Sequence, residues 1–156
     1  MDGIQFERVN SGDSRTIGKI AGWYSAEWQM EPAKTIQKIS AFPDQGIPFQ
    51  ILISVDGIPV ATGGLYEHVG LLDVAPRFKI YGPWLALVLT IPEYRKKGYG
   101  TLLCEEIQDR AKELGLKELF LFTRTAESLY RRMGWTLIEQ NNMKGQDVFV
   151  MKKVLL

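Results

Sequence analysis

The chain has 156 residues, 46% of them hydrophobic and 24% charged, which is typical of a folded protein and excludes disordered, collagenous and coiled-coil classes. This length predicts a single domain, residues 1–156, since one domain takes roughly 100–200 residues. Nineteen Lys and Arg residues face 18 Asp and Glu residues, so the net charge of +1 lacks the basic excess of a dedicated nucleic-acid binder. We therefore expect no nucleic-acid partner.

The cysteine and histidine content and the hydropathy of the chain exclude further classes of protein. A single cysteine, Cys104, excludes an internal disulfide, and with the single histidine, His68, it argues against a structural zinc site. The first residues do not read as a secretory signal. The longest dense apolar run, Trp84 to Leu89, is far shorter than the ~20 residues of a membrane span. We expect a cytoplasmic protein with no metal and no membrane partner.

The first half of the chain predicts strands and helices in alternation. Ile4, Phe6 and Val9 indicate a first strand, and Asp13 or Ser14 caps a helix that continues through Trp28. Pro32 fits the first turn of a second helix. Residues 49–55 and 58–66 predict two strands, joined by a tight hairpin turn at Asp56-Gly57. Residues 67–83 are expected to be mostly loop.

The second half begins with a continuous apolar run, residues 84–90, which predicts a strand buried on both faces. The pattern then predicts a helix over 98–114, a strand over 118–122 and a short helix over 126–133. Two closing strands are expected at 136–140 and 148–152, joined by a loop that contains Lys144-Gly145. This alternation of strands and helices around a hairpin predicts a mixed α/β or α+β class.

The turn between the predicted strand 84–90 and the predicted helix 98–114 contains the residues most indicative of function. Its residues are Arg95-Lys96-Lys97-Gly98-Tyr99-Gly100-Thr101. Backbone N–H groups at a helix N-terminus bind anions, and glycines let the backbone approach a ligand closely. With three basic side chains beside them, these groups suit a pyrophosphate. The P-loop string is absent, and Leu103 stands where a dinucleotide fingerprint needs its third glycine.

What remains, Arg-x-x-Gly-x-Gly, resembles the pyrophosphate loop [QR]-x-x-G-x-[GA] of the GNAT superfamily, the acetyl-CoA-dependent N-acetyltransferases. The segment from Ala126 to Trp135, which contains Tyr130 and Gly134, is similar to the short helix that follows in that family, and the order of the other elements agrees over nearly the whole chain. The resemblance implies a mostly antiparallel sheet of six or seven strands with about four flanking helices. It also implies that the central pair of parallel strands splays apart near Thr90.

The resemblance further implies acetyl-CoA as co-substrate, and it assigns the residues that bind it. These are expected to be Val88, Leu89, Thr90, Arg95, Lys96, Lys97, Gly98, Tyr99, Gly100, Thr101, Thr123, Ala126 and Tyr130. Thr90 stands where many relatives have Val, and Thr123 where many have Asn. The backbone from Lys97 to Thr101 would hold the pyrophosphate, and the strand from Val88 to Thr90 would hold the pantetheine arm.

In this family the tyrosine of the short helix protonates the leaving thiolate, which makes Tyr130 the general acid. The central strand carries no acid, so the general base stays open between Glu67 and Glu27, with Asp73 and His68 as further candidates and a water relay as the alternative. Cys104 lacks the His or Asp partner pattern of a nucleophile and is read as a packing residue.

The function implied is transfer of an acetyl group from acetyl-CoA to a primary amine of a small molecule or protein, by direct attack in a ternary complex. The alternative is a catalytically silent acetyl-CoA-binding module of the same fold, which would act as a sensor or interaction domain. The partner is then a small-molecule or peptide amine, and the resemblance is compatible with a homodimer.

Overall fold

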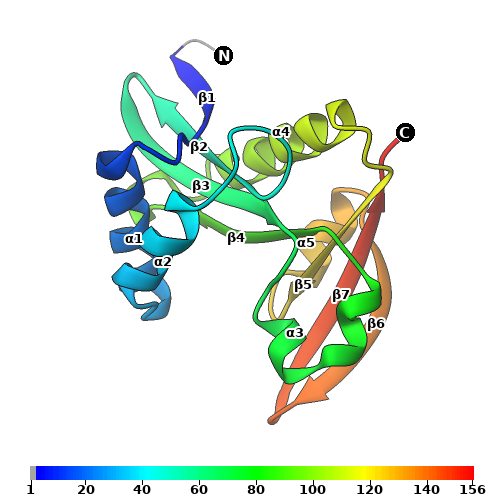
Figure 1. The fold of residues 1–156 in the computed structure, drawn as a ribbon. Coiled ribbons are helices and arrows are strands. Elements are labelled where there is room, and N and C mark those ends of the chain that lie inside the picture. The colour runs from blue at the N-terminus through cyan, green and yellow to red at the C-terminus, as the bar shows by residue number, and fades with distance from the viewer. Residues whose placement is uncertain (1–2) are drawn as a thin grey trace. The chain divides into compact units, whose positions relative to one another are not determined.

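The computed structural model describes residues 3–156, and its elements follow one another as Figure 1 shows. The bounds are β1 Ile4–Arg8, α1 Ser14–Trp28, α2 Pro32–Ser40, β2 Phe49–Val55, β3 Ile58–Tyr66, α3 Leu71–Val74, β4 Trp84–Thr90, α4 Tyr99–Glu113, β5 Glu118–Thr123, α5 Glu127–Arg132, β6 Thr136–Met143 and β7 Gln146–Val154. Two 3₁₀ turns, η1 Pro76–Ile80 and η2 Pro92–Tyr94, flank β4. The strands form one mixed sheet in the order β1-β2-β3-β4-β5-β7-β6, which confirms the predicted fold class.

The described chain divides into two compact units. The N-terminal unit comprises residues 3–65 and 87–107, and the C-terminal unit comprises residues 66–86 and 108–156. The boundary falls inside β4, whose residues from Leu87 onward belong to the N-terminal unit.

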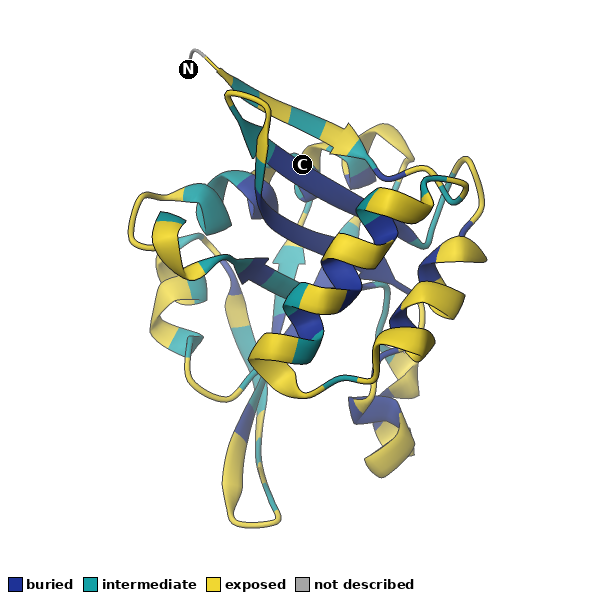
Figure 2. Cartoon of the chain, turned by 90° about the vertical axis from the view of Figure 1, so that its left-hand side faces the viewer, coloured by how far each residue is buried: buried dark blue, intermediate teal, exposed yellow. Residues whose placement is uncertain are grey.

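In the N-terminal unit, α1 begins where the sequence predicts. The Asp13 carboxylate accepts a hydrogen bond from the Thr16 N–H at 3.1 Å and so caps the helix. One face of α1 is buried, and Figure 1 shows α2 running beside it. Asp56 (φ 51°) and Gly57 (φ 82°) are both left-handed, as the predicted tight hairpin between β2 and β3 requires. Strands β2 and β3 are largely buried, whereas β1 and β6 contain exposed and half-buried residues only, and α1 has one buried face (Figure 2).

A buried polar network ties this unit together. The Gln50 amide donates to the Tyr24 hydroxyl and to the Thr62 hydroxyl, both at 2.8 Å. The Thr62 hydroxyl donates to the Ile51 carbonyl at 2.8 Å, and the Tyr24 hydroxyl donates to the Leu87 carbonyl at 2.7 Å. Because buried polar groups are costly when unpaired, these hydrogen bonds hold α1, β2, β3 and Leu87 of β4 in one arrangement.

In the C-terminal unit, β5 lies between the parallel β4 and the antiparallel β7. Trp84 is opposite Phe120, and the Phe120 N–H donates to the Pro83 carbonyl at 2.9 Å, so the predicted parallel pair is confirmed. The β6–β7 hairpin is longer than predicted, because the expected loop is only a two-residue turn. Lys144 (φ 53°) and Gly145 (φ 80°) are left-handed there, and Met143 pairs with Gln146.

Two predictions about the middle of the chain are wrong in part. Residues 67–83 are not mostly loop, because the buried side chains of Leu71, Leu72 and Phe78 anchor α3 and η1. The central strand β4 is not buried on both faces throughout, because its residues 86–88 are half-buried. Leu87 is left-handed (φ 58°) there and interrupts the regular alternation of the strand.

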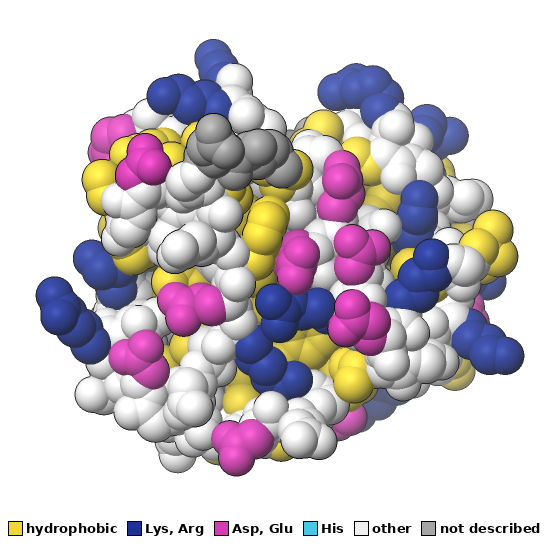
Figure 3. All heavy atoms as spheres, turned by 90° about the horizontal axis from the view of Figure 1, so that it is seen from above, with side chains coloured by type: hydrophobic (Ala, Val, Ile, Leu, Met, Phe, Trp, Pro, Cys, Tyr) yellow, Lys and Arg dark blue, Asp and Glu magenta, His cyan; other side chains and the backbone are white. Residues whose placement is uncertain are grey.

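Charge and hydropathy add two observations. Within residues 3–156, none of the helices combines the length and the apolar character needed to span a membrane. On the face drawn in Figure 3, Lys and Arg side chains are interspersed with Asp and Glu side chains, in keeping with the near-zero net charge.

Candidate functional site

The segment from η2 to the first turn of α4, called here the α4 loop (residues 92–101), provides an anion-binding geometry. Lys96 (φ 64°) and Gly98 (φ 88°) are both left-handed and turn the chain sharply from β4 into the helix. The Leu102 N–H donates to the Gly98 carbonyl at 3.1 Å, which closes the first helical turn. The N–H groups of the residues between them lie at the helix N-terminus, where a helix has no internal acceptor for its first donors.

The space beside this N-terminus is open. A Cβ built on Gly98 would meet no atom within 4 Å, and one built on Gly100 would only touch the Thr90 hydroxyl, at 4.0 Å. The protein's own packing therefore does not explain why Gly100 lacks a side chain. A close approach of a ligand to this backbone would explain it, and phosphate groups are ligands that helix N-termini bind.

Arg95 and Glu27, both singled out from the sequence, contact each other. The Arg95 guanidinium donates to the Glu27 carboxylate at 2.6 Å and to the Thr90 carbonyl at 2.8 Å. This pair joins the α4 loop to the last turn of α1 and to the end of β4. Arg95 thus holds the loop in place, while Lys96 and Lys97 carry its remaining positive charge. The Lys97 ammonium lies 5.4 Å from the centroid of the Tyr94 ring.

The three β4 residues predicted to bind the pantetheine arm follow the left-handed Leu87. The left-handed conformation costs about 1–2 kcal/mol for a non-glycine residue such as Leu87. The Tyr24 hydroxyl binds the Leu87 carbonyl and stabilises this conformation. On the neighbouring strand, a Cβ on Gly63 would come within 3.1 Å of the Val88 side chain, so β3 and β4 pack tightly there.

The C-terminal unit holds the second group of predicted residues. Thr123 ends β5, and its hydroxyl accepts a hydrogen bond from the Ala126 N–H at 3.0 Å, so this side chain organises the turn into α5. The Tyr130 N–H donates to the Ala126 carbonyl at 3.1 Å. The half-buried Tyr130 ring packs edge-on against the buried ring of Trp135, with 6.1 Å between their centroids. Gly134 (φ 93°) makes the turn that brings these two rings together.

The remaining candidate catalytic residues lie outside the α4 loop and the turn before α5. Glu67 is exposed, directly after β3 in the C-terminal unit. The His68 ring lies 3.1 Å from the Asp73 carboxylate, so these two candidate bases form a pair with each other. Cys104 is buried in α4, as expected of a packing residue. The described residues contain no group of three or more His, Cys, Asp or Glu side chains that could hold a metal ion.

A hydrogen-bonded cluster fixes the segment after α3. The Arg77 guanidinium (2.7 Å) and the Tyr81 hydroxyl (2.9 Å) both donate to the Glu139 carboxylate on β6. The Arg77 hydrogen bond lowers the pKa of Glu139, with partial burial opposing the shift. The hydrogen bond between the Tyr81 hydroxyl and the Glu139 carboxylate raises the pKa of Tyr81.

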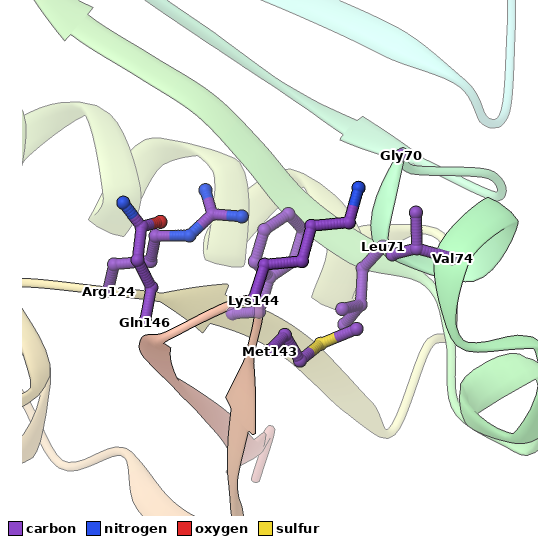
Figure 4. A pocket seen from close by; sticks show the side chains of 8 residues that line it. Gly70, Leu71, Val74, Arg124, Met143, Lys144 and Gln146 are labelled. Atoms are coloured by element: carbon purple, nitrogen blue, oxygen red, sulfur yellow. The ribbon is translucent and has the colours of Figure 1, made fainter.

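Sequence reasoning missed a cavity in the C-terminal unit. It is about 320 Å³ in volume, and its polar lining includes Arg124, Lys144 and Gln146 (Figure 4). Arg124 directly follows the predicted Thr123, and Lys144 lies in the hairpin turn, but nothing in the sequence indicates that the two side chains share one space.

The comparisons with known proteins show the family of this chain. The model of the GNAT acetyltransferase family matches residues 17–135, which include the α4 loop and α5. The chain belongs to the GNAT family. The resemblance seen in the sequence is thereby confirmed.

Individual relatives in this family are distant. An amino-acid acetyltransferase of Mannheimia succiniciproducens is 27% identical over 140 residues, which cover 86% of this chain and 29% of that protein. The chain spans between 12% and 29% of the length of the first curated relatives that it matches.

Solved structures share the fold at low identity. An aminoglycoside 6'-N-acetyltransferase complexed with coenzyme A has a TM-score of 0.76 at 12% identity, with 97% of each chain covered. N-acetylglutamate synthase from Neisseria gonorrhoeae, complexed with coenzyme A and N-acetyl-glutamate, has a TM-score of 0.68 at 15% identity, with 98% of this chain and 35% of that chain covered.

Proposed function

We propose that residues 1–156 form an N-acetyltransferase domain that moves an acetyl group from acetyl-CoA to a primary amine. The observation that carries this proposal is the open, glycine-lined N-terminus of α4 directly after β4, in a chain that belongs to the GNAT family. Neighbours of the same fold that were solved with coenzyme A support the choice of co-substrate. The amino-acid acetyltransferases among the relatives support an amine acceptor.

The proposed binding residues divide by role. Backbone N–H groups from Lys97 to Thr101 would hold the pyrophosphate, with Lys96 and Lys97 adding charge. Polar backbone groups from Val88 to Thr90 would hold the pantetheine arm. Thr123 and Ala126, which form the turn before α5, are further proposed binding residues. When bound, acetyl-CoA supplies an activated acetyl thioester.

The chain's own residues would then perform three tasks. The acceptor must lose a proton before it can attack, because an alkyl amine has an ordinary pKa of about 10.4. Glu67 accepts that proton, directly or through water, and releases it to solvent before the attack. Once the N–C bond has formed, Glu67 accepts the second proton that the nitrogen loses as it becomes an amide. The Leu89 N–H, or a neighbouring one, donates to the acyl oxygen as negative charge develops there. Tyr130 donates its phenolic proton to the sulfur as the C–S bond breaks, and solvent reprotonates the phenolate.

The first test is Tyr130→Phe. The phenyl ring still packs on Trp135, so acetyl-CoA affinity should fall far less than kcat. We expect kcat to fall by about 10²-fold, near the low end for general acid catalysis, because a thiol with an ordinary pKa of about 8.5 is already a fair leaving group. Steady-state kinetics and calorimetry on the same protein measure both quantities. An unchanged kcat on the best amine would remove Tyr130 from the mechanism.

The second test compares Glu67→Gln with its matched control Glu27→Gln. Glu67 is the preferred base because the Glu27 carboxylate is bound to Arg95, whereas among the described residues Glu67 has no ion-pair partner. Glu67→Gln should lower kcat at pH 7 by about 10²-fold and lose less at high pH, where the amine deprotonates by itself. Glu27→Gln should mainly weaken acetyl-CoA binding. The opposite pattern would make Glu27 the base.

A further inference from the structure

The cavity in the C-terminal unit is formed by three segments that are far apart in the chain. Gly70, Leu71 and Val74 come from the start of α3, Arg124 from the end of β5, and Lys144 and Gln146 from the β6–β7 turn. In Figure 4 the side chains of Arg124, Lys144 and Gln146 project into the same space, with Leu71 and Val74 on its other side.

The polar part of this cavity is cationic. Among residues 3–156, no hydrogen bond or ion pair neutralises the Arg124 guanidinium or the Lys144 ammonium. Both side chains are exposed to the cavity and the solvent beside it. No Asp or Glu is among the lining residues. Two positive charges therefore face one small space without a protein counter-charge.

Three carboxylates on the elements that form the cavity are engaged elsewhere. Asp147 follows Gln146 and therefore points to the opposite face of β7, where it accepts a hydrogen bond from the Asn142 amide at 3.3 Å. Asp73 is paired with His68, and Glu139 is held by Arg77 and Tyr81. Since none of them neutralises the cavity, the missing negative charge is expected to come from a ligand.

The apolar part of the cavity limits what else the ligand carries. Leu71 and Val74 face the cavity together with Phe122 and Met143, so an apolar segment of the ligand would be covered there. The volume of about 320 Å³ lies at the small end of the roughly 300–1,000 Å³ range of ligand pockets, which favours a small molecule over a peptide.

The cavity is adjacent in sequence to the turn that leads into α5. Phe122 and Arg124 line it, and the intervening Thr123 makes the turn into α5, which carries Tyr130. The cavity thus lies in the same unit as Tyr130 and Glu67.

On this basis we propose that the cavity binds the acceptor and selects a small amine that carries a carboxylate and an apolar segment, the chemistry of an apolar α-amino acid. The proposal rests on the proposed acetyl transfer. The Arg124 guanidinium takes the carboxylate through paired N–H donors, Lys144 adds a second charge, and the Gln146 amide offers a further donor.

The test uses L-leucine and L-leucinamide, which differ only in the carboxylate. For the wild type, Arg124→Gln and Lys144→Gln, the ratio of kcat/KM for leucine to that for leucinamide is measured. Because one ratio is compared between proteins, the different basicity of the two amines cancels. We expect each substitution to lower the ratio by about tenfold, mainly through the KM for leucine. The affinity for acetyl-CoA should stay unchanged.

The control is Lys117→Gln, which removes an exposed positive charge just before the other end of β5 and should leave the ratio unchanged. An unchanged ratio in Arg124→Gln, or a loss of acetyl-CoA affinity in that variant, would overturn the proposal.

A binding measurement without turnover separates the two proposals. Calorimetry of N-acetyl-L-leucine in the presence of coenzyme A should give a dissociation constant that rises about tenfold in Arg124→Gln and not in Lys117→Gln. If the dissociation constant rises in Arg124→Gln alone while no amine is acetylated, the proposed acetyl transfer is wrong and the cavity assignment stands. If N-acetyl-L-leucine does not bind the wild type, or binds all variants equally, the cavity assignment is wrong.

Discussion

Gly100→Val is the sharpest perturbation of the α4 loop, because the structure separates its effect on folding from its effect on binding. In the protein alone, a Cβ at this position touches only the Thr90 hydroxyl, at 4.0 Å. Gly is about 1 kcal/mol and Val about 0.6 kcal/mol less favourable than Ala in a helix. The stability of the variant should therefore differ from wild type by less than about 0.5 kcal/mol.

Binding should respond very differently. A phosphate oxygen that accepts from this helix N-terminus lies about 2.9 Å from the donor nitrogen, while carbon contacts need about 3.5–4.0 Å. The branched methyl groups of Val would occupy the space through which that oxygen approaches. We expect the affinity for acetyl-CoA to drop at least tenfold, about 1.4 kcal/mol.

The assay is calorimetric titration of acetyl-CoA, with thermal unfolding followed by circular dichroism on the same samples. Gly100→Ala is the matched control, since the family's loop pattern accepts Gly or Ala here, and it should retain binding. A folded Gly100→Val protein with unchanged affinity would refute the placement of the pyrophosphate on this loop.

Two predictions concern the support of the site. Asp13→Ala should lower the free energy of unfolding by about 1 kcal/mol, because it removes the cap of α1. Hydrogen bonds from Thr16 lower the pKa of Asp13, so this contribution is present above the ordinary pKa of about 3.9 and is lost only as the pH falls through the lower folded value. Urea unfolding should give the same difference at pH 7 and pH 5, and a difference that halves at pH 5 would be inconsistent with this cap. Tyr24→Phe should cost about 1–3 kcal/mol, because it leaves the half-buried Leu87 carbonyl without its donor and the buried Gln50 amide without one of its acceptors, and a loss below 0.3 kcal/mol by denaturant unfolding would show that these bonds contribute little.

The sequence predicted the order of elements well, because the signals for them are local. Asp13 caps α1, Asp56-Gly57 makes the hairpin turn, and Gly134 ends the turn after α5, each through its own backbone preference. The α4 loop was predicted for the same reason, since two glycines and three basic residues stand together at one helix start.

The features that the sequence did not reveal depend on contacts between distant segments. Nothing marks Leu87 as left-handed, because leucine disfavours that conformation and the Tyr24 hydroxyl that holds it is 63 residues away. Glu27 and Arg95 are 68 residues apart, and their pairing follows only from the packing of α1 beside the end of β4. The cavity is likewise assembled from α3, β5 and the β6–β7 turn.

Acetyl transfer is tested most directly by the release of thiol from acetyl-CoA by the wild-type protein across a panel of primary amines, with the products identified by mass. We expect thiol release in step with formation of an acetylated amine, and less of both in Gly100→Val and in Tyr130→Phe. Tight acetyl-CoA binding with no release above the rate of the amines alone, for any member of the panel, would contradict an acetyltransferase and favour a silent acetyl-CoA-binding module.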